Sequence, residues 1–234
     1  MLGPIIWPGL AGRSYKPALD RFCFSRIDPE ECESIGSRAD TCRRRETIQS
    51  KQRGQMSEGG IVLGAGRDHV QGEIEAPITL LEYGDYECRS CAKAQPIVRE
   101  IQQRLGDKLC YAFRHFPVTP VHPHAQRAAQ AAEAANAQGK FWEMHELLLE
   151  NQYALDDKIL SACAAALGLD EARLIGEVML EIYARRIHRD FNLGVREGVN
   201  GTPCFFINGR RYDGAIRFEP LLLAIQRNCG YGKD

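Results

Sequence analysis

The chain lacks a long hydrophobic run, an excess of charge of one sign and a second pair of closely spaced cysteines. No apolar stretch approaches the roughly 20 residues that a membrane-spanning helix requires, so no membrane insertion is expected. The formal net charge of −1 over 234 residues favours neither nucleic acid nor an anionic membrane surface as a partner. A zinc ribbon needs two ligand pairs and the chain has one, so we predict no metal and no other cofactor.

Most of the nine cysteines are scattered singly along the chain. Cys110 lies in an apolar, strand-like run and Cys163 in an alanine-rich segment, so we interpret both as buried free thiols. Scattered cysteines in apolar surroundings are more typical of a reducing compartment than of a secreted domain held by disulfides. The first eight residues have no basic region and resemble a secretion signal poorly. We therefore predict a cytoplasmic location, with export to an oxidising compartment as the alternative.

Cys88 and Cys91 are the exception, because they are close together at the junction of two contrasting patterns. Residues 78–83 form an apolar run typical of a buried strand, and residues 92–105 have the apolar spacing of a helix. The first sulfur would then lie at a helix N-terminus, where free backbone N–H groups and the helix dipole favour a thiolate. We predict that Cys88 is the nucleophile and that Cys91 resolves the mixed disulfide formed through it.

Arg89 and Ser90, between the two cysteines, are predicted to tune this chemistry. The positive charge of Arg89 is expected to lower the pKa of Cys88 further. A more stable thiolate stabilises the reduced form and makes the disulfide a better oxidant. The alternatives, a zinc half-site or two idle thiols, are less favoured because no second ligand pair has matching spacing.

From about residue 68 the chain alternates between strand and helix patterns. Strands are expected at 78–83 and 108–116, with a hairpin of residues 204–207 and 210–212 around an Asn-Gly turn. The segment 124–198 is expected to be entirely helical, and its last helix is expected to cover residues 170–195. This order, with a final helix at 218–227, predicts an α/β, thioredoxin-like fold with a helical subdomain inserted between the βαβ half and the ββα half.

These patterns divide the chain into three parts. Residues 1–60 carry charge runs and little periodicity and are predicted to be a disordered leader; we hypothesise that the functional protein begins near Met56. Residues 61–120 and 199–231 form the predicted thioredoxin-like domain. Residues 121–198 form the helical subdomain, which is expected to supply an apolar surface beside the cysteine pair.

Several motifs, in the same order, are similar to those of the DsbA-like branch of the thioredoxin superfamily. The resemblance covers about residues 68–225. The motifs are EYGDY at 82–86 before the cysteine pair, FRHFP at 113–117, HPHA at 122–125, GKFWEMH at 139–145, GVNGTP at 198–203 and FFING at 205–209. The chain departs from many relatives at Arg89, where they carry proline, and this departure leaves the redox potential open.

The resemblance implies two further site elements. Pro203 is expected to be cis and to face the cysteines, so that the backbone of Thr202 can pair with an extended substrate strand. Glu82 is expected to lie beneath the cysteines with a raised pKa and to move the proton between them. The residues alone leave open a trans proline at a strand start and a Glu82 carboxyl in water. Strand alternation is expected to point Cys204 away from the pair.

We therefore expect a thiol–disulfide oxidoreductase that acts on cysteine-containing proteins and is recycled by a redox partner. Whether it is an oxidase, a reductase or an isomerase stays open. One alternative is a glutathione-dependent isomerase or transferase, which would be expected to use a single Ser or Cys. Another is a non-catalytic, chaperone-like interaction module. His122, His124 and His145 are interpreted as structural residues rather than metal ligands.

Overall fold

The computed structural model describes residues 63–64 and 67–228. The fold below is that of the described part of the unit Met56–Asp234. The predicted disordered leader, residues 1–60, lies entirely outside the described residues, as does the hypothesised start near Met56.

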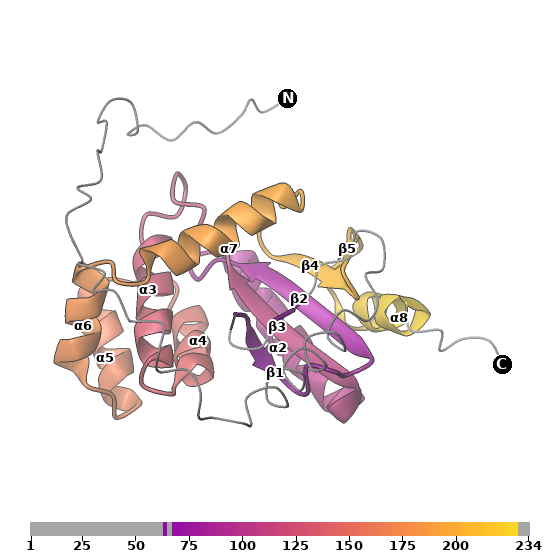
Figure 1. The fold of residues 1–234 in the computed structure, drawn as a ribbon, viewed down its shortest axis with the longest axis horizontal. Coiled ribbons are helices and arrows are strands. Elements are labelled where there is room, and N and C mark those ends of the chain that lie inside the picture. The colour runs from indigo at the N-terminus through magenta and orange to yellow at the C-terminus, as the bar shows by residue number, and fades with distance from the viewer. Residues whose placement is uncertain (1–62, 65–66, 229–234) are drawn as a thin grey trace, which may run out of the picture. The chain divides into compact units, whose positions relative to one another are not determined.

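A five-stranded mixed sheet forms the centre of the fold, with the strand order β1-β3-β2-β4-β5 (Figure 1). Strands β2 and β3 are parallel, and the other neighbouring pairs are antiparallel. The strands are β1 (His69–Gln71), β2 (Ile78–Gly84), β3 (Leu109–His115), β4 (Cys204–Ile207) and β5 (Arg210–Tyr212). Strand β1 is not predicted from the sequence, because three residues are too few to show a period.

The described residues form seven α-helices and one short 3-10 helix. The helices are α2 (Arg89–Leu105), η1 (Gly106–Lys108), α3 (Ala125–Asn136), α4 (Phe141–Glu150), α5 (Asp157–Ala166), α6 (Glu171–Met179), α7 (Ala184–Arg196) and α8 (Phe218–Asn228). None of these helices is long and apolar enough to cross a membrane. The fold class is thus the predicted one, α/β with a helical block between the two halves of the sheet.

The hairpin of β4 and β5 shows how a local signal determines structure. Asn208 and Gly209 both have positive φ, 47° and 76°, as the type I′ turn between two antiparallel strands requires. Asn208 Oδ1 also accepts a hydrogen bond of 2.7 Å from the backbone N–H of Thr79 on the neighbouring strand. The predicted Asn-Gly hairpin is therefore confirmed.

Each face of the sheet carries its own apolar cluster. On one face, Leu80 packs with residues of α2 and α8, such as Val98 and Leu221. On the other face, Leu81 and neighbouring residues pack against Phe191 of α7. Because successive residues of a strand point to opposite faces, the side chain of Glu82 lies on the same face as Leu80, beneath α2.

The helical block has a third apolar cluster, built around the alanines of α3. Helix α3 contacts α4 and α6, and its small side chains allow this close approach. Cys88 and Cys91 belong to the same cluster, so the cysteine pair lies where the sheet and the block meet. Helix α7, the last helix within the predicted block, contacts β3. It packs on the face of the sheet opposite to α2 and α8.

The helix predicted over 170–195 is wrong in one respect, because the chain breaks between α6 and α7. Glu181 has a positive φ of 51°, which interrupts the helical backbone. Gln130 of α3 accepts a hydrogen bond of 2.9 Å from the backbone N–H of Tyr183 and holds the turn. Ile182, which the helical spacing placed on the buried face, is 56% exposed. No proline or glycine marks this break in the sequence.

Candidate active site

Cys88 caps the N-terminus of α2, and Cys91 lies in the first turn of the helix. The backbone N–H groups of Cys91 and Ala92 donate to the Cys88 carbonyl at 3.0 and 3.3 Å. Both cysteines are free thiols. Cys88 is 8% exposed and Cys91 only 1%, so Cys88 is the more accessible sulfur, as its predicted role as the nucleophile requires.

The two sulfurs have opposite pKa shifts. A hydrogen bond with the Cys91 side chain is the largest cause that lowers the pKa of Cys88, to about 5, and burial of the sulfur opposes it. Further hydrogen bonds come from the Thr202 side chain and from the backbone N–H groups of Cys91 and Ser90. Burial raises the pKa of Cys91 well above its usual value. At neutral pH the reduced pair therefore carries one thiolate, on Cys88.

Arg89 and Ser90 differ in how they relate to Cys88. Ser90 acts through its backbone N–H, which any residue other than proline would supply. The guanidinium of Arg89 lies 5.5 Å from the centre of the Tyr153 ring and is not among the main causes of the lowered pKa of Cys88. The expected lowering of the Cys88 pKa by the charge of Arg89 therefore stays a prediction.

Glu82 is buried, with 2% of its surface exposed. The Tyr111 hydroxyl donates to Glu82 Oε2 at 2.8 Å. Burial raises the pKa of Glu82 to about 7, and the nearby Cys88 adds to the rise, while the Tyr111 hydrogen bond opposes it. The carboxyl is thus not in water, and it titrates near neutral pH. Its predicted part in proton transfer stays a prediction.

The Thr202–Pro203 segment faces the reactive sulfur. The peptide bond between these residues is cis, and the Cys88 thiol donates to the Thr202 carbonyl at 3.3 Å. Cys204, the next residue, packs with Leu81 on the opposite face of the sheet, where burial raises its pKa. Cys204 is therefore separated from the cysteine pair, as strand alternation predicts.

Asp85 and His122 form a pair beside Cys88 whose contact the sequence did not predict. His122 Nδ1 lies 2.8 Å from Asp85 Oδ2, and the Asp85 backbone N–H donates to Cys91 Sγ at 3.5 Å. The second Asp85 oxygen accepts from the backbone N–H of Glu87 at 2.8 Å. Asp85 thereby fixes the loop that leads into the cysteine pair. Both residues lie in motifs already noted, but their contact depends on the fold.

Gln152 is a further residue of the site that the sequence did not reveal. Its side-chain amide donates to the Cys88 carbonyl at 3.3 Å, so it ties the end of α4 to the start of α2. A pocket of about 480 Å³ is lined by Cys88, Gln152, His122 and Tyr153, among others. This lining combines polar side chains with the Tyr153 ring, and the apolar surface expected from the helical block stays a prediction.

One cluster could in principle offer metal ligands. His69, His115 and Glu133 each place a ligand atom within 4.8 Å of the others, and both imidazoles contact Glu133 Oε1, at 2.8 and 2.9 Å. The Arg186 guanidinium, however, donates to the same oxygen and lies 2.8 Å from His69 Nε2. A metal cation would therefore lie beside a fixed positive charge, and the residues do not suit one.

The three histidines singled out in the sequence have packing or anchoring roles. His145 lies within hydrogen-bond distance of the Tyr86 hydroxyl, at 3.1 Å, and burial lowers its pKa to about 3, so it is neutral. The backbone N–H of His124 donates to Glu87 Oε2 at 2.7 Å. Among the described residues, neither His145 nor His124 joins a group that could hold a metal.

The comparisons with known proteins agree with this architecture. A family model described as Thioredoxin matches residues 65–227. The chain belongs to the thioredoxin family. Within the thioredoxin family, the fold of this chain is the DsbA-like variant, because the structure is similar to that of BdbD from Bacillus subtilis. The TM-score is 0.65, and the two chains are 22% identical over 73% of this chain and 97% of BdbD. It is also similar to alpha-DsbA1 from Wolbachia pipientis, with a TM-score of 0.63 and 22% identity over 72% and 94%.

A second kind of relative is a larger protein. This thioredoxin-family chain is 46% identical over 159 residues to a Na(+)/H(+) antiporter NhaA 1 from Salinispora arenicola. The match covers 68% of this chain and 24% of the antiporter, so the chain spans about a quarter of the length of the curated relatives it matches.

Proposed function

We propose that this chain is a protein thiol–disulfide oxidoreductase that works through Cys88 and Cys91. The observation that carries the proposal is the pairing of an accessible sulfur of lowered pKa with a buried sulfur of raised pKa. Such a pair favours attack at Cys88 and resolution by Cys91. Because the reduced form gains a stable thiolate, the disulfide is expected to be a good oxidant.

In the oxidising direction, a substrate thiolate attacks Cys88 Sγ and breaks the Cys88–Cys91 bond. A mixed disulfide forms, and Cys91 leaves as a thiolate that takes up a proton. A second substrate thiolate then attacks the substrate sulfur and releases Cys88 as a thiolate. The substrate loses two electrons and becomes a disulfide, and the protein pair gains them. The reductase direction is the exact reverse of these steps.

Glu82 is proposed to supply and accept the proton of Cys91. The charge of Glu82 is one of the causes that raise the pKa of Cys91, so the two groups are close enough to influence each other. A carboxyl with a pKa of about 7 is half protonated at neutral pH, which suits both directions of transfer. Thr202 is proposed to present its backbone to the substrate beside Cys88.

The partners and the compartment are proposals as well. Cysteine-containing proteins would be the substrates, and a second redox protein would recycle the pair. The lowered pKa of Cys88 favours an oxidising compartment, the alternative to the predicted cytoplasm, because it favours disulfide donation.

An equilibrium titration of Cys88 and Cys91 against glutathione tests the proposal, with the Cys88 pKa followed by thiolate absorbance. We expect a potential more oxidising than the roughly −270 mV of thioredoxin and a pKa well below about 8.5. Cys163→Ser serves as the control, because Cys163 is a buried free thiol in the helical block. Failure of the pair to form a disulfide, or full exchange activity in Cys88→Ser, would refute the proposal.

A further inference from the structure

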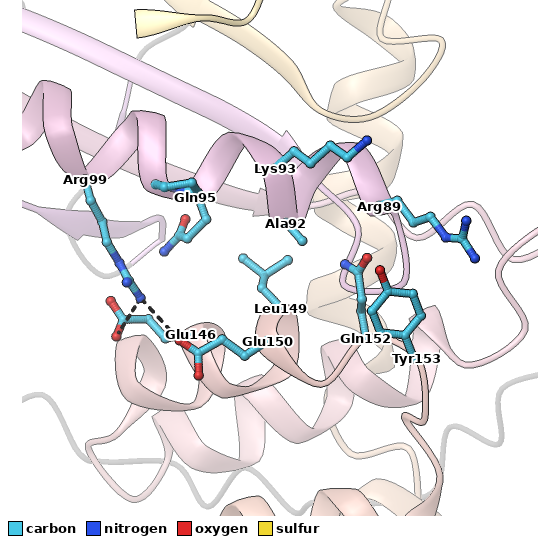
Figure 2. A pocket seen from close by; sticks show the side chains of 11 residues that line it. Arg89, Ala92, Lys93, Gln95, Arg99, Glu146, Leu149, Glu150, Gln152 and Tyr153 are labelled. Carbon is cyan, nitrogen blue, oxygen red and sulfur yellow. Dashed lines mark ion pairs between the residues drawn. The ribbon is translucent and has the colours of Figure 1, made fainter.

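A groove between α2 and α4 adjoins the pocket at Cys88 (Figure 2). Its volume is about 440 Å³. Ala92 and Leu149 give it an apolar floor, and Arg89, Gln152 and Tyr153 line both the groove and the pocket that contains Cys88. A chain held at Cys88 can therefore continue directly into this groove.

The two ends of the groove differ in charge. At the far end, Arg99 Nη2 lies 3.0 Å from Glu146 and 3.9 Å from Glu150, so its charge is compensated. At the end near Cys88, Arg89 and Lys93 lie four residues apart on α2, and hence on one side of the helix. Neither forms an ion pair with any residue in the described part of the chain.

The groove end near Cys88 also has an aromatic wall. Tyr153 is 79% exposed, and the guanidinium of Arg89 lies over its ring. Figure 2 shows Gln152 and Tyr153 across from Arg89 and Lys93. Because Gln152 is hydrogen bonded to the Cys88 carbonyl, this wall is fixed relative to the reactive cysteine.

We propose that this end of the groove binds acidic residues that flank the reactive cysteine of a protein substrate. Lys93 and Arg89 would pair with the substrate carboxylates while Cys88 holds the substrate sulfur in a mixed disulfide. The inference rests on the proposed function and makes these two residues determinants of its specificity. Complementary charge beside the reacting atom accelerates productive encounter.

The test compares the rates at which the oxidised protein oxidises two different peptides, each with one cysteine, in a single turnover. One peptide has Asp and Glu on both sides of the cysteine, and the other has Asn and Gln. Each rate is divided by the rate at which the same peptide reacts with a small uncharged disulfide. This correction is needed because acidic neighbours alter the pKa and reactivity of the peptide thiol itself. We expect a preference for the acidic peptide of about threefold to tenfold at low salt, and its loss in 1 M salt, where the Debye length is about 3 Å.

Lys93→Glu should reverse the preference for the acidic peptide. Lys158→Glu is the control, because it makes an equal charge change at an exposed residue of α5 outside both pockets, and it should leave the preference unchanged. Lys93 is exposed, so the variant is expected to fold. An unchanged ratio in Lys93→Glu, or no preference in the unaltered protein, would overturn the inference. So would a Lys93-dependent preference for reduced glutathione over both peptides. If the unaltered protein oxidised neither peptide, the proposed function itself would fail.

Discussion

Two buried glutamates in this molecule have opposite electrostatic surroundings. Glu82 and Glu133 are 2% and 1% exposed, so both are equally removed from water. Glu82 accepts a hydrogen bond from the neutral hydroxyl of Tyr111, and its pKa is raised to about 7. Glu133 contacts two histidines and Arg186. Burial alone would raise its pKa, but the hydrogen bonds and charges of His115 and His69 hold that pKa well below the usual range.

The comparison shows that partners, rather than burial, separate a carboxyl that titrates near neutral pH from one that stays charged. A carboxylate surrounded by fixed donors stays charged and holds neighbouring elements together. A carboxyl with a single neutral partner can gain and lose a proton near neutral pH, and such groups are found at functional sites. Four experiments test this difference between Glu82 and Glu133.

Glu133→Gln is expected to have the largest effect. The change leaves the partly buried Arg186 guanidinium without its counterion and removes the charged acceptor shared by His69 and His115, so the free energy of unfolding should fall by about 1.5–3 kcal/mol. Urea denaturation at pH 7 measures the loss. Glu82→Gln is the matched control, and it should retain or gain stability, because ionising Glu82 in its buried site costs free energy. Equal losses in the two variants would contradict the assignment of a structural role to Glu133 alone.

Glu82→Gln is expected to slow the step that forms or breaks the Cys91 sulfur bond by about 100-fold, since the proton donor is lost. Single-turnover exchange across a pH series should also lose its inflection near 7. Alkylation of Cys88 in the same variant should stay fast. This control distinguishes a loss of proton transfer at Cys91 from a loss of Cys88 reactivity. A pH profile identical to that of the unaltered protein would show that another group moves the proton.

The oxidation state of the cysteine pair should also change the stability of the protein. Cys88, which raises the pKa of Glu82, can ionise only in the reduced form. The pKa of Cys88 is about 5 in the folded protein and about 8.5 when unfolded. The reduced form should therefore gain stability over the oxidised form as pH rises between these values, and lose that advantage as pH falls to about 5. Urea denaturation of both forms across pH measures it, and Cys88→Ser should abolish the dependence. A pH-independent difference would rule out a low thiolate pKa.

Tyr111→Phe should have the smallest effect. The Tyr111 hydrogen bond opposes the raised pKa of Glu82, so its removal should shift the inflection in exchange rate upward by less than about one pH unit. A downward shift would mean that the hydroxyl stabilises the protonated carboxyl instead.

The sequence revealed those parts of the site that depend on local order. The two cysteines at a strand-to-helix junction and the Asn-Gly turn are each defined by a few consecutive residues, and both lie where expected. The break at Glu181 could not be predicted because the helical spacing continues across it, and the hydrogen bond from the Tyr183 backbone N–H to Gln130, which holds the turn, joins residues far apart in the sequence.

The Glu133 cluster could not be predicted because its members come from distant segments. Glu133 lies 64 residues from His69 and 18 from His115, and they meet only once α3 packs against the sheet. One signal was present in the sequence. Glu133 is the sole acidic residue in an otherwise alanine-rich helix, and a charge among small residues on a buried face requires partners.

The two edges of the sheet have a consequence for how this protein would meet other chains. Strands β1 and β5 are only three residues long, and β5 begins with the exposed Arg210 and Arg211. Short edges with charged side chains offer little template for an added strand. Under the proposed function, an unfolded substrate chain would thus find few free backbone groups at the sheet edges, so it could leave after sulfur exchange instead of aggregating on the protein.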